Sequence, residues 1–148
     1  MPKPRTIRAA LAVVSRRGRY LICQRRTGAF LGGYWEFPGG KREPGESWEM
    51  CVRRELKEEL GISVTALKPL AFLRHRYKAA SITFKVFRCR LAHGIPRPLG
   101  AQALRWVTPN QLRRYRFPPA NRVLLAKLSR RLSMAQRRGI IVSPTEGG

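Results

Sequence analysis

The spacing of apolar residues predicts two strands at the start of the chain. Residues 7–14 (IRAALAVV) and 19–25 (RYLICQR) are rich in apolar and β-branched side chains. The segment 15–18 between them ends in glycine and is expected to form a hairpin turn. Three glycines in residues 27–33 predict a mobile loop, and residues 34–38 predict a short third strand.

A repeat of apolar residues at every fourth position predicts a helix next. Val52, Leu56 and Leu60 would form its buried stripe. Ser47 is suited to cap the start of this helix, and Gly61 can end it in a left-handed conformation. The glycines and prolines that precede the helix predict a loop; they are Gly39, Gly40, Pro44 and Gly45.

The second half of the chain predicts three more strands and two more helices. The strands are expected at residues 62–74, 81–91 and 104–107. Thr108 is expected to cap a short helix, and residues 117–121 (FPPAN) are expected to form a rigid turn. A C-terminal helix is expected at about 121–137, followed by a frayed tail at 139–148. The apolar face of that helix would consist of Leu124, Leu128 and Leu132.

The order of strands, helix, strands and helix indicates an α/β or α+β fold with a mixed sheet. The 148 residues fit one domain with one hydrophobic core, and no linker divides them. No apolar run approaches the roughly 20 residues that span a bilayer, so no membrane segment is expected. Three scattered cysteines, Cys23, Cys51 and Cys89, lack zinc spacing and are expected to be buried apolar residues in a reducing, cytoplasmic setting.

Charge changes this picture, because 31 Lys and Arg residues stand against 8 acids, none of them Asp. Seven of the eight glutamates lie within residues 36–59, and outside that window 26 basic residues face Glu146 alone. A positive field of this size attracts polyanions, either nucleotides or nucleic acid. A general preference for arginine in the source proteome is the alternative explanation.

Three glutamates of the predicted helix form an acidic face. Glu55, Glu58 and Glu59 stand at positions i, i+3 and i+4, so they point to one side of the helix. Like charges at this spacing repel, and a divalent cation would neutralise them. Hard oxygen ligands suit Mg²⁺ or Mn²⁺, whose remaining positions are commonly filled by water and substrate phosphates. A solvated glutamate-rich surface is the alternative, but it would have drawn on Asp as well.

Residues 40–62 (GKREPGESWEMCVRRELKEELGI) also resemble the Nudix box of the Nudix hydrolases. That pattern is a Gly, five residues, a Glu, seven residues, then Arg-Glu-aliphatic-x-Glu-Glu-x-Gly-aliphatic. All nine specified positions match, and they are Gly40, Glu46, Arg54, Glu55, Leu56, Glu58, Glu59, Gly61 and Ile62. The resemblance implies the Nudix fold, a mixed sheet between helices, with the box as a metal-binding loop–helix–loop.

The resemblance assigns roles to the residues of the box. Arg54 would orient a catalytic glutamate through a charge-assisted hydrogen bond. Glu46 would assist in the outer shell of the metal or serve as a further ligand. The metal ligands would be Glu55, Glu58, Glu59 and the backbone carbonyl of Gly40.

The segments that flank the box resemble the MutT branch, the 8-oxo-dGTP diphosphatases and related nucleoside triphosphate pyrophosphohydrolases. They are residues 24–26 (QRR), 35–41 (WEFPGGK) and 117–121 (FPPAN). The resemblance implies that Arg26 contacts phosphate, that Phe37 lies beside the base, that Asn121 hydrogen-bonds the purine edge, and that Lys41 is a further substrate-binding residue. From the residues alone, Arg26 could equally be a solvated strand end, Phe37 a core residue and Asn121 a helix cap.

The chain departs from the MutT pattern in two places. MutT-type enzymes often carry another glutamate in the loop that corresponds to residues 97–105, and this loop has no acid. Residues 78–82 also lack the base-contacting arginine of MutT. Any general base is therefore expected among Glu43, Glu46, Glu55, Glu58 and Glu59, or from the metal site alone.

The acidic face and the resemblance together predict an Mg²⁺-dependent hydrolase. The resemblance to MutT implies that it converts a nucleoside triphosphate, with 8-oxo-dGTP or dGTP first, into the monophosphate and pyrophosphate. A pyrimidine triphosphate is the second substrate expectation. The alternative class is a basic nucleic-acid-binding protein, and a hybrid would cleave the 5′ end of RNA. The pattern does not indicate an oligomeric state.

Overall fold

The structure, a computed structural model, describes residues 5–128. Its strands are β1 (Arg5–Arg16), β2 (Arg19–Gln24), β3 (Trp35–Glu36), β4 (Gly39–Lys41), β5 (Ser63–Arg76), β6 (Ala80–His93) and β7 (Ala103–Val107). Its helical segments are α1 (Trp48–Leu60), the short 3-10 helices η1 (Pro109–Arg114) and η2 (Pro119–Asn121), and a last helix at residues 122–128. Leu132, the remainder of the helix predicted at 121–137, and the predicted tail at 139–148 lie outside the described residues.

One mixed sheet contains all these strands. Its order is β3-β2-β1-β6-β5, with β4 paired to β1 and β7 paired to β2. The long pairing of β1 with β6 is parallel, and the other pairings are antiparallel. The predicted mixed α+β architecture is confirmed.

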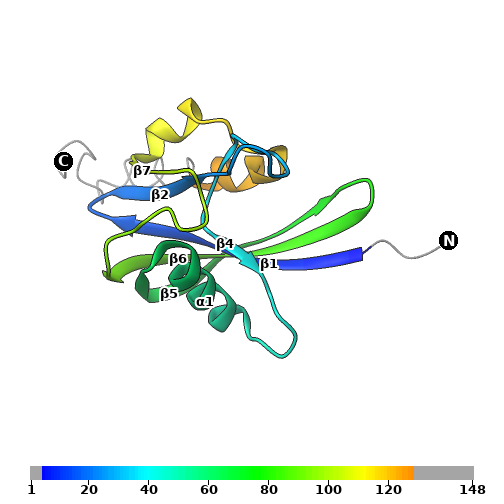
Figure 1. Cartoon of the computed structure of the whole chain (residues 1–148), viewed down its shortest axis with the longest axis horizontal. Coiled ribbons are helices and arrows are strands. Elements are labelled where there is room, and N and C mark those ends of the chain that lie inside the picture. Colours follow the sequence, from blue (N-terminus) through cyan, green and yellow to red (C-terminus); the bar gives the residue numbers. More distant parts are fainter. Residues whose placement is uncertain (1–4, 129–148) are drawn as a thin grey trace.

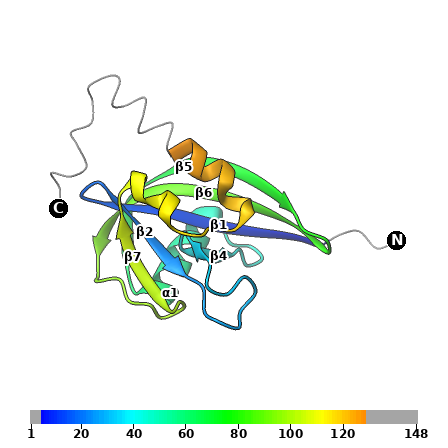
Figure 2. The same ribbon diagram turned by 90° about the horizontal axis from the view of Figure 1, so that it is seen from above.

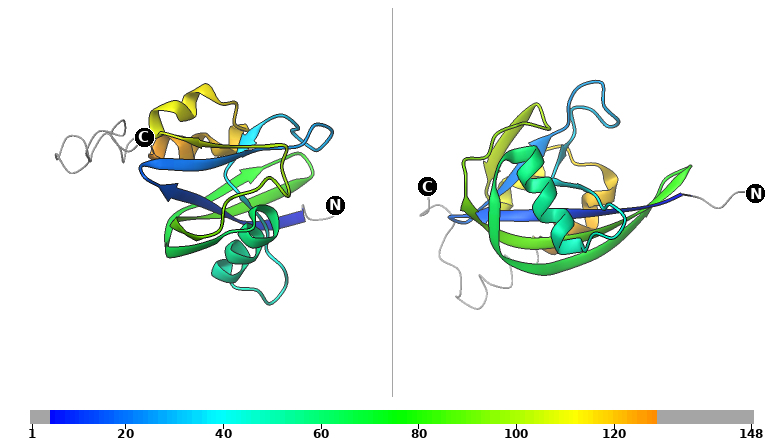
Figure 3. Two further views of the ribbon diagram at one scale, coloured as in Figure 1. Left: turned by 60° about the vertical axis from the view of Figure 1, so that its left-hand side comes forward. Right: turned by 60° about the horizontal axis from the view of Figure 1, so that its bottom comes forward.

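Helical segments cover both faces of the sheet, as Figures 1 and 2 show. On one face α1 buries Cys51, Val52, Leu56 and Leu60 against alternate residues of β1 and β6. On the other face η1 and the last helix bury Leu112, Leu124 and Leu128. Because side chains alternate along a strand, the same strands supply both cores. Figure 3 shows this arrangement from two further directions.

The sequence prediction for Gly39 and Gly40 was wrong, because these residues form strand β4 rather than a loop. Gly39 pairs with Leu11, and Gly40 pairs with Ala10. Gly39 has a φ of 152°, and a Cβ there would collide with the carbonyl oxygen of Ala10. A glycine can therefore pack against β1 where another residue could not.

The predicted turn and caps are confirmed. Arg17 and Gly18 have φ values of 50° and 77°, which are typical of a two-residue hairpin turn. The Ser47 hydroxyl accepts a hydrogen bond from the Met50 N–H at 3.1 Å, and Gly61 ends α1 with a φ of 69°.

Cys23, Cys51 and Cys89 are buried free thiols, as predicted. Burial raises the pKa of Cys51 to about 11, so this thiol stays protonated near neutral pH. Within residues 5–128, no helix is long and apolar enough to cross a membrane.

Candidate active site

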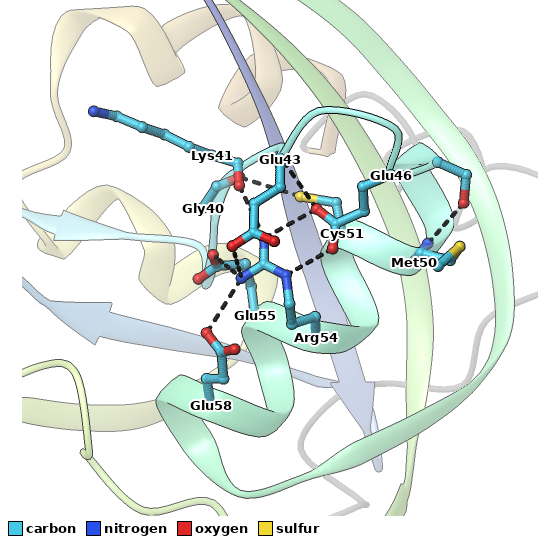
Figure 4. A network of polar contacts seen from close by, with 10 residues as sticks. Gly40, Lys41, Glu43, Glu46, Met50, Cys51, Arg54, Glu55 and Glu58 are labelled. Carbon is cyan, nitrogen blue, oxygen red and sulfur yellow. Dashed lines mark hydrogen bonds and ion pairs between the residues drawn. The ribbon is translucent and has the colours of Figure 1, made fainter.

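Arg54, on the solvent side of α1, is the centre of the charged cluster in Figure 4. Its guanidinium binds Glu46 through two hydrogen bonds, Nε to Oε2 at 2.6 Å and Nη2 to Oε1 at 3.0 Å. Nη2 also donates to the carbonyl of Lys41 at 3.1 Å. This planar, bidentate contact joins the loop before α1 to the middle of the helix.

The same contact sets the charge state of Glu46. The hydrogen bond from Arg54 and the backbone N–H of Glu43 lower the pKa of Glu46 to about 2. The carboxylates around Arg54 in turn raise the pKa of the guanidinium. Glu46 and Arg54 are therefore a permanently ionised pair at any physiological pH.

Arg54 also holds the first two glutamates of the predicted acidic face. Its Nη1 donates to Glu55 at 2.8 Å and to Glu58 at 3.2 Å, and it lies 3.8 Å from Glu43. The side chain of Glu58 is 60% exposed, whereas that of Glu55 is 13% exposed. Glu55 is therefore the more constrained of these two carboxylates.

Gly40 packs directly against the carboxylate of Glu55. A Cβ at position 40 would collide with the Glu55 carboxyl group. Gly40 reaches this position because β4 pairs with β1 and places it opposite Ala10, on the face that α1 covers. The glycine that begins the box is thus required by close packing against an acidic side chain.

Glu59 is the third glutamate of the acidic face, and it is half-buried. Burial, the charge of Glu55 and a side-chain hydrogen bond with Glu55 raise the pKa of Glu59 to about 8. The loop before β7 closes over it, because the N–H groups of Leu99 and Gly100 donate to the Glu59 backbone carbonyl at 3.0 and 3.2 Å. Glu55 and Glu59 thus form a close carboxylate pair that favours a bound proton or cation.

The donor set suits a hard divalent cation, although it is not preformed. Among residues 5–128, no three acidic, histidine or cysteine side chains already form a group that could hold a metal ion. Glu58 is turned toward Arg54, while Glu55 and Glu59 share a hydrogen bond. Carboxylate oxygens next to a close-packed glycine backbone are ligands that Mg²⁺ and Mn²⁺ accept.

Glu36 is a neighbouring acid to which the sequence analysis gave no role. It pairs with Cys23, whose side chain belongs to the α1-side core, and it makes an ion pair with Arg25 at 3.0 Å. Burial raises the pKa of Glu36, and its charge contributes to the raised pKa of Glu59. Its membership of the glutamate-rich window was the signal in the sequence.

The four predicted substrate-binding residues occupy different surroundings. Arg26 donates to the carbonyl of Leu99 at 2.8 Å and so ties the loop before β7 to the end of β2. Lys41 is exposed at the end of β4, next to the Arg54 cluster. Phe37 is fully buried, and its ring packs on that of Phe117 at a centroid distance of 5.4 Å.

Asn121 lies on the far side of the sheet from α1, in the same region as Phe37. Its side chain is 8% exposed. Its backbone N–H donates to the Pro118 carbonyl at 2.9 Å, and the last helix begins at the following residue. Asn121 therefore stands directly before this helix, and its predicted roles, a base contact or a helix cap, stay predictions.

A cavity of about 220 Å³ lies between η1 and the last helix. It is lined by Pro109, Asn110, Leu112, Arg113, Leu125 and Ala126. It contains no acid and lies on the opposite face from α1. The carboxylates, not this cavity, therefore identify the candidate active site.

Comparisons with known proteins agree with this geometry. The family model of the NUDIX domain matches residues 9–127. The chain is 34% identical to the CTP pyrophosphohydrolase of Escherichia coli over 119 residues, which cover 80% of this chain and 88% of that one. It is 35% identical to the 8-oxo-dGTP diphosphatase of the same species over 109 residues, which cover 74% and 84%.

Solved structures show the same fold. The solution structure of the E. coli ORF135 protein has a TM-score of 0.76 at 30% identity, and the match covers 91% of this chain and 94% of that one. A MutT structure from work on Aliivibrio salmonicida and Vibrio cholerae has a TM-score of 0.71 at 32% identity, with 84% and 97% covered. The chain therefore belongs to the Nudix hydrolases, as a MutT-like nucleotide pyrophosphohydrolase.

Proposed function

We propose that this Nudix hydrolase cleaves nucleoside triphosphates to the monophosphate and pyrophosphate in an Mg²⁺-dependent reaction. The observation that carries the proposal is the carboxylate pair of Glu55 and Glu59, close-packed by Gly40 and oriented by Arg54. A cluster of this kind is stabilised by a cation, and a nucleotide phosphate can complete the shell of that cation.

The box residues would divide the work between metal binding and positioning. Glu55, Glu58, Glu59 and the Gly40 carbonyl would hold the metal, which supplies charge neutralisation at the phosphates and lowers the pKa of water. Arg54 holds Glu46 and Glu55 through charge-assisted hydrogen bonds, so these side chains do not have to be ordered when substrate binds. Arg26 and Lys41 would contact the substrate phosphates.

The leading substrate is 8-oxo-dGTP, with dGTP as its unoxidised counterpart. The side-chain amide of Asn121, a residue that is 8% exposed, offers an acceptor and a donor together. Its oxygen can accept from N7–H of an oxidised guanine while its N–H serves O6. Several relatives are named 8-oxo-dGTP diphosphatase.

CTP is the second candidate. It is favoured by the 34% identity to a CTP pyrophosphohydrolase that covers 80% of this chain. The absence of an arginine at residues 78–82 also removes one purine contact expected for MutT.

One experiment tests both the reaction and the substrate. The purified protein is incubated with 8-oxo-dGTP, dGTP, CTP or dCTP in the presence of Mg²⁺ or Mn²⁺, and monophosphate and pyrophosphate are quantified by anion-exchange chromatography. We expect equimolar release of both products, no reaction in EDTA, and the highest kcat/KM for 8-oxo-dGTP. Release of orthophosphate instead of pyrophosphate, or equal turnover with EDTA, would contradict the proposal.

A further inference from the structure

Three strands of the sheet continue beyond the N-terminal end of α1, at residues 5–10 of β1, 71–76 of β5 and 80–85 of β6. We call this extension the arm. Figures 1 and 2 show it running toward the N-terminus, past the rest of the sheet. The strand register shows which of its side chains share a face.

The register aligns charged residues in rows across the arm. Arg8 pairs with Thr83, which pairs with Arg74 on the other side. The next row on the same face, two residues along each strand, joins Ala10, Lys85 and Phe72. Ala10 belongs to the core beneath α1, so both rows lie on the α1 side of the sheet. Arg76, which pairs with Ser81 in the next row, lies on this face too.

The start of the Nudix box adds a cation and an aromatic ring to the same face. The Arg42 N–H donates to the Arg8 carbonyl at 2.8 Å, which extends the row by one strand. The Arg42 guanidinium lies 4.8 Å from the centre of the Trp48 ring. The Trp48 ring in turn meets Phe72 edge to face, with centroids 5.9 Å apart. Phe72 is 61% exposed, so most of this residue is open to solvent.

The positive charge of this face is not compensated. Within the part of the chain that the structure describes, Arg25 and Arg54 are the only basic residues that make ion pairs. Glu49, in the first turn of α1, is exposed but makes no ion pair there. The cations of the face are Arg8, Arg42, Arg74, Arg76 and Lys85. Mutual repulsion of this kind is relieved by a polyanion.

We propose that the α1-side face of the arm binds a single-stranded nucleic acid. The arginines would contact successive phosphates, and unpaired bases would stack on Phe72 and Trp48. The row from Arg42 to Arg74 crosses three strand spacings, about 14 Å, which suits several linked phosphates better than one. A duplex keeps its bases stacked on one another, so it cannot use the exposed ring of Phe72. This inference does not depend on which nucleotide the active site hydrolyses.

A charge-matched pair of variants tests the phosphate contacts. The first is Arg8→Gln, Arg74→Gln and Arg76→Gln combined. The control is Lys68→Gln, Arg88→Gln and Arg90→Gln combined, since these exposed residues lie on the opposite face of β5 and β6 and remove the same charge. Binding of fluorescein-labelled dT12 and U12 is measured by anisotropy over a range of salt concentrations.

We expect the arm variant to bind at least tenfold more weakly than wild type near physiological salt. The negative slope of log K against log salt should become shallower by about 2, since each lost phosphate contact with a single strand contributes roughly 0.7. The control variant should retain most of the binding. Equal weakening of both variants would overturn the proposal, because it would mean that net charge rather than this face binds the strand.

Variants of Phe72 distinguish base stacking from attraction between charges. Phe72→Ala should weaken binding of dT12 or U12 by about 5- to 150-fold, and Phe72→Tyr should restore it. Neither variant should change the affinity for a 12-base-pair duplex or for polyphosphate. Comparing dT12 with U12 shows whether the face distinguishes DNA from RNA. Two outcomes would exclude base stacking on the arm. The wild type could bind duplex or polyphosphate as tightly as the single strands, or Phe72→Ala could bind the single strands as tightly as the wild type.

Folding and hydrolysis provide the controls for these variants. Phe72 and the three arginines are exposed, so each variant should keep the wild-type melting temperature within a few degrees. None of them belongs to the carboxylate cluster, so nucleotide hydrolysis at saturating substrate should be unchanged. Loss of hydrolysis in parallel with strand binding would mean that the arm serves the active site instead.

Discussion

At the scale of single residues, one arginine organises most of the acidic site. Arg54 contacts Glu43, Glu46, Glu55 and Glu58, the closest of them at 2.6 Å. Glu59 makes no ion pair with Arg54 and is instead hydrogen-bonded to Glu55. Arg54 therefore neutralises part of the acidic face. Glu59, beside Glu55, still requires a proton or a cation.

The first prediction is that Glu59→Gln lowers kcat by about 100-fold or more, since a metal-positioning carboxylate is lost. The fold should be retained, because glutamine keeps the size of the side chain and removes its need for a proton or a cation. Glu49→Gln is the matched control, as Glu49 lies exposed on the same helix without an ion pair among residues 5–128. Full activity of Glu59→Gln with normal Mg²⁺ dependence would contradict the assignment.

The second prediction concerns pH in the absence of metal. The pKa of Glu59 is raised from 4.5 to about 8, so between these values the folded state binds more protons than the unfolded state. The stability of the metal-free protein should therefore fall as pH rises from about 5 to 8. Melting temperatures by differential scanning fluorimetry check this trend.

Two controls belong to the pH experiment. Glu59→Gln should flatten the decline, and Mg²⁺ should raise the melting temperature of the wild type most at pH 8. A wild-type melting temperature that rises over this range in EDTA would contradict the environment described for Glu59.

The third prediction concerns Asn121 and base recognition. Asn121→Ala should narrow the preference for 8-oxo-dGTP over dGTP by about 5- to 150-fold, mainly through KM, because a matched polar contact with the base is lost. The measurement is kcat/KM for both substrates. Asn110→Ala, at an exposed asparagine of η1, is the control and should leave the ratio unchanged. A wild-type enzyme without preference for the oxidised base would remove Asn121 from the recognition site.

At the scale of elements, strand β4 determines where the acidic site lies. It contains only Gly39–Lys41, yet it fastens the beginning of the Nudix box to the centre of the sheet. Gly39 fits against the Ala10 carbonyl, and Gly40 fits against Glu55. Two adjacent glycines thus meet steric demands on opposite sides of one short strand.

The fourth prediction is that Gly39→Ala destabilises the protein by at least about 2 kcal/mol, or on the order of 5–10 °C in melting temperature. The added Cβ would collide with the Ala10 carbonyl. Gly28→Ala provides the control, because Gly28 has a φ of 93° but no atom within 4 Å of the added Cβ. Equal losses for both variants would assign the effect to backbone conformation alone and not to the contact with β1.

At the scale of the whole molecule, charge is strongly segregated. The chain carries a net charge of +23, while seven of its eight acids lie in residues 36–59. An anionic substrate would therefore approach through a positive field, and seven of the eight carboxylates lie in the segment that contains the candidate site. Such a field raises association rates more than it changes the chemical step.

The fifth prediction is that kcat/KM for a triphosphate falls steeply between about 0.05 and 0.5 M salt, while kcat changes little. Screening weakens long-range attraction but not the close contacts around Arg54. Steady-state kinetics in NaCl and in potassium glutamate separate screening from specific ion effects. A kcat/KM that does not change with salt would show that the field does not steer substrate.

The sequence by itself determined most of the secondary structure, the family and the acidic face. Apolar spacing is a local property, so it predicted α1 with its cap at Ser47 and its end at Gly61. The same reasoning failed for Gly39 and Gly40. Glycine indicates a turn when it is considered alone, and only the neighbouring strand shows that the chain is extended there.

Only the tertiary structure decided which charges meet. Glu46 and Arg54 are eight positions apart, and Glu36 comes from a different strand, so their contacts depend on how β3, β4 and α1 pack. The arm is a similar case, since Arg8 and Arg74 share a row only because β1 and β5 both pair with β6. Arg42 joins the row through its hydrogen bond to Arg8. Local sequence determines which face of a strand a residue occupies, but pairing between distant segments decides what lies beside it.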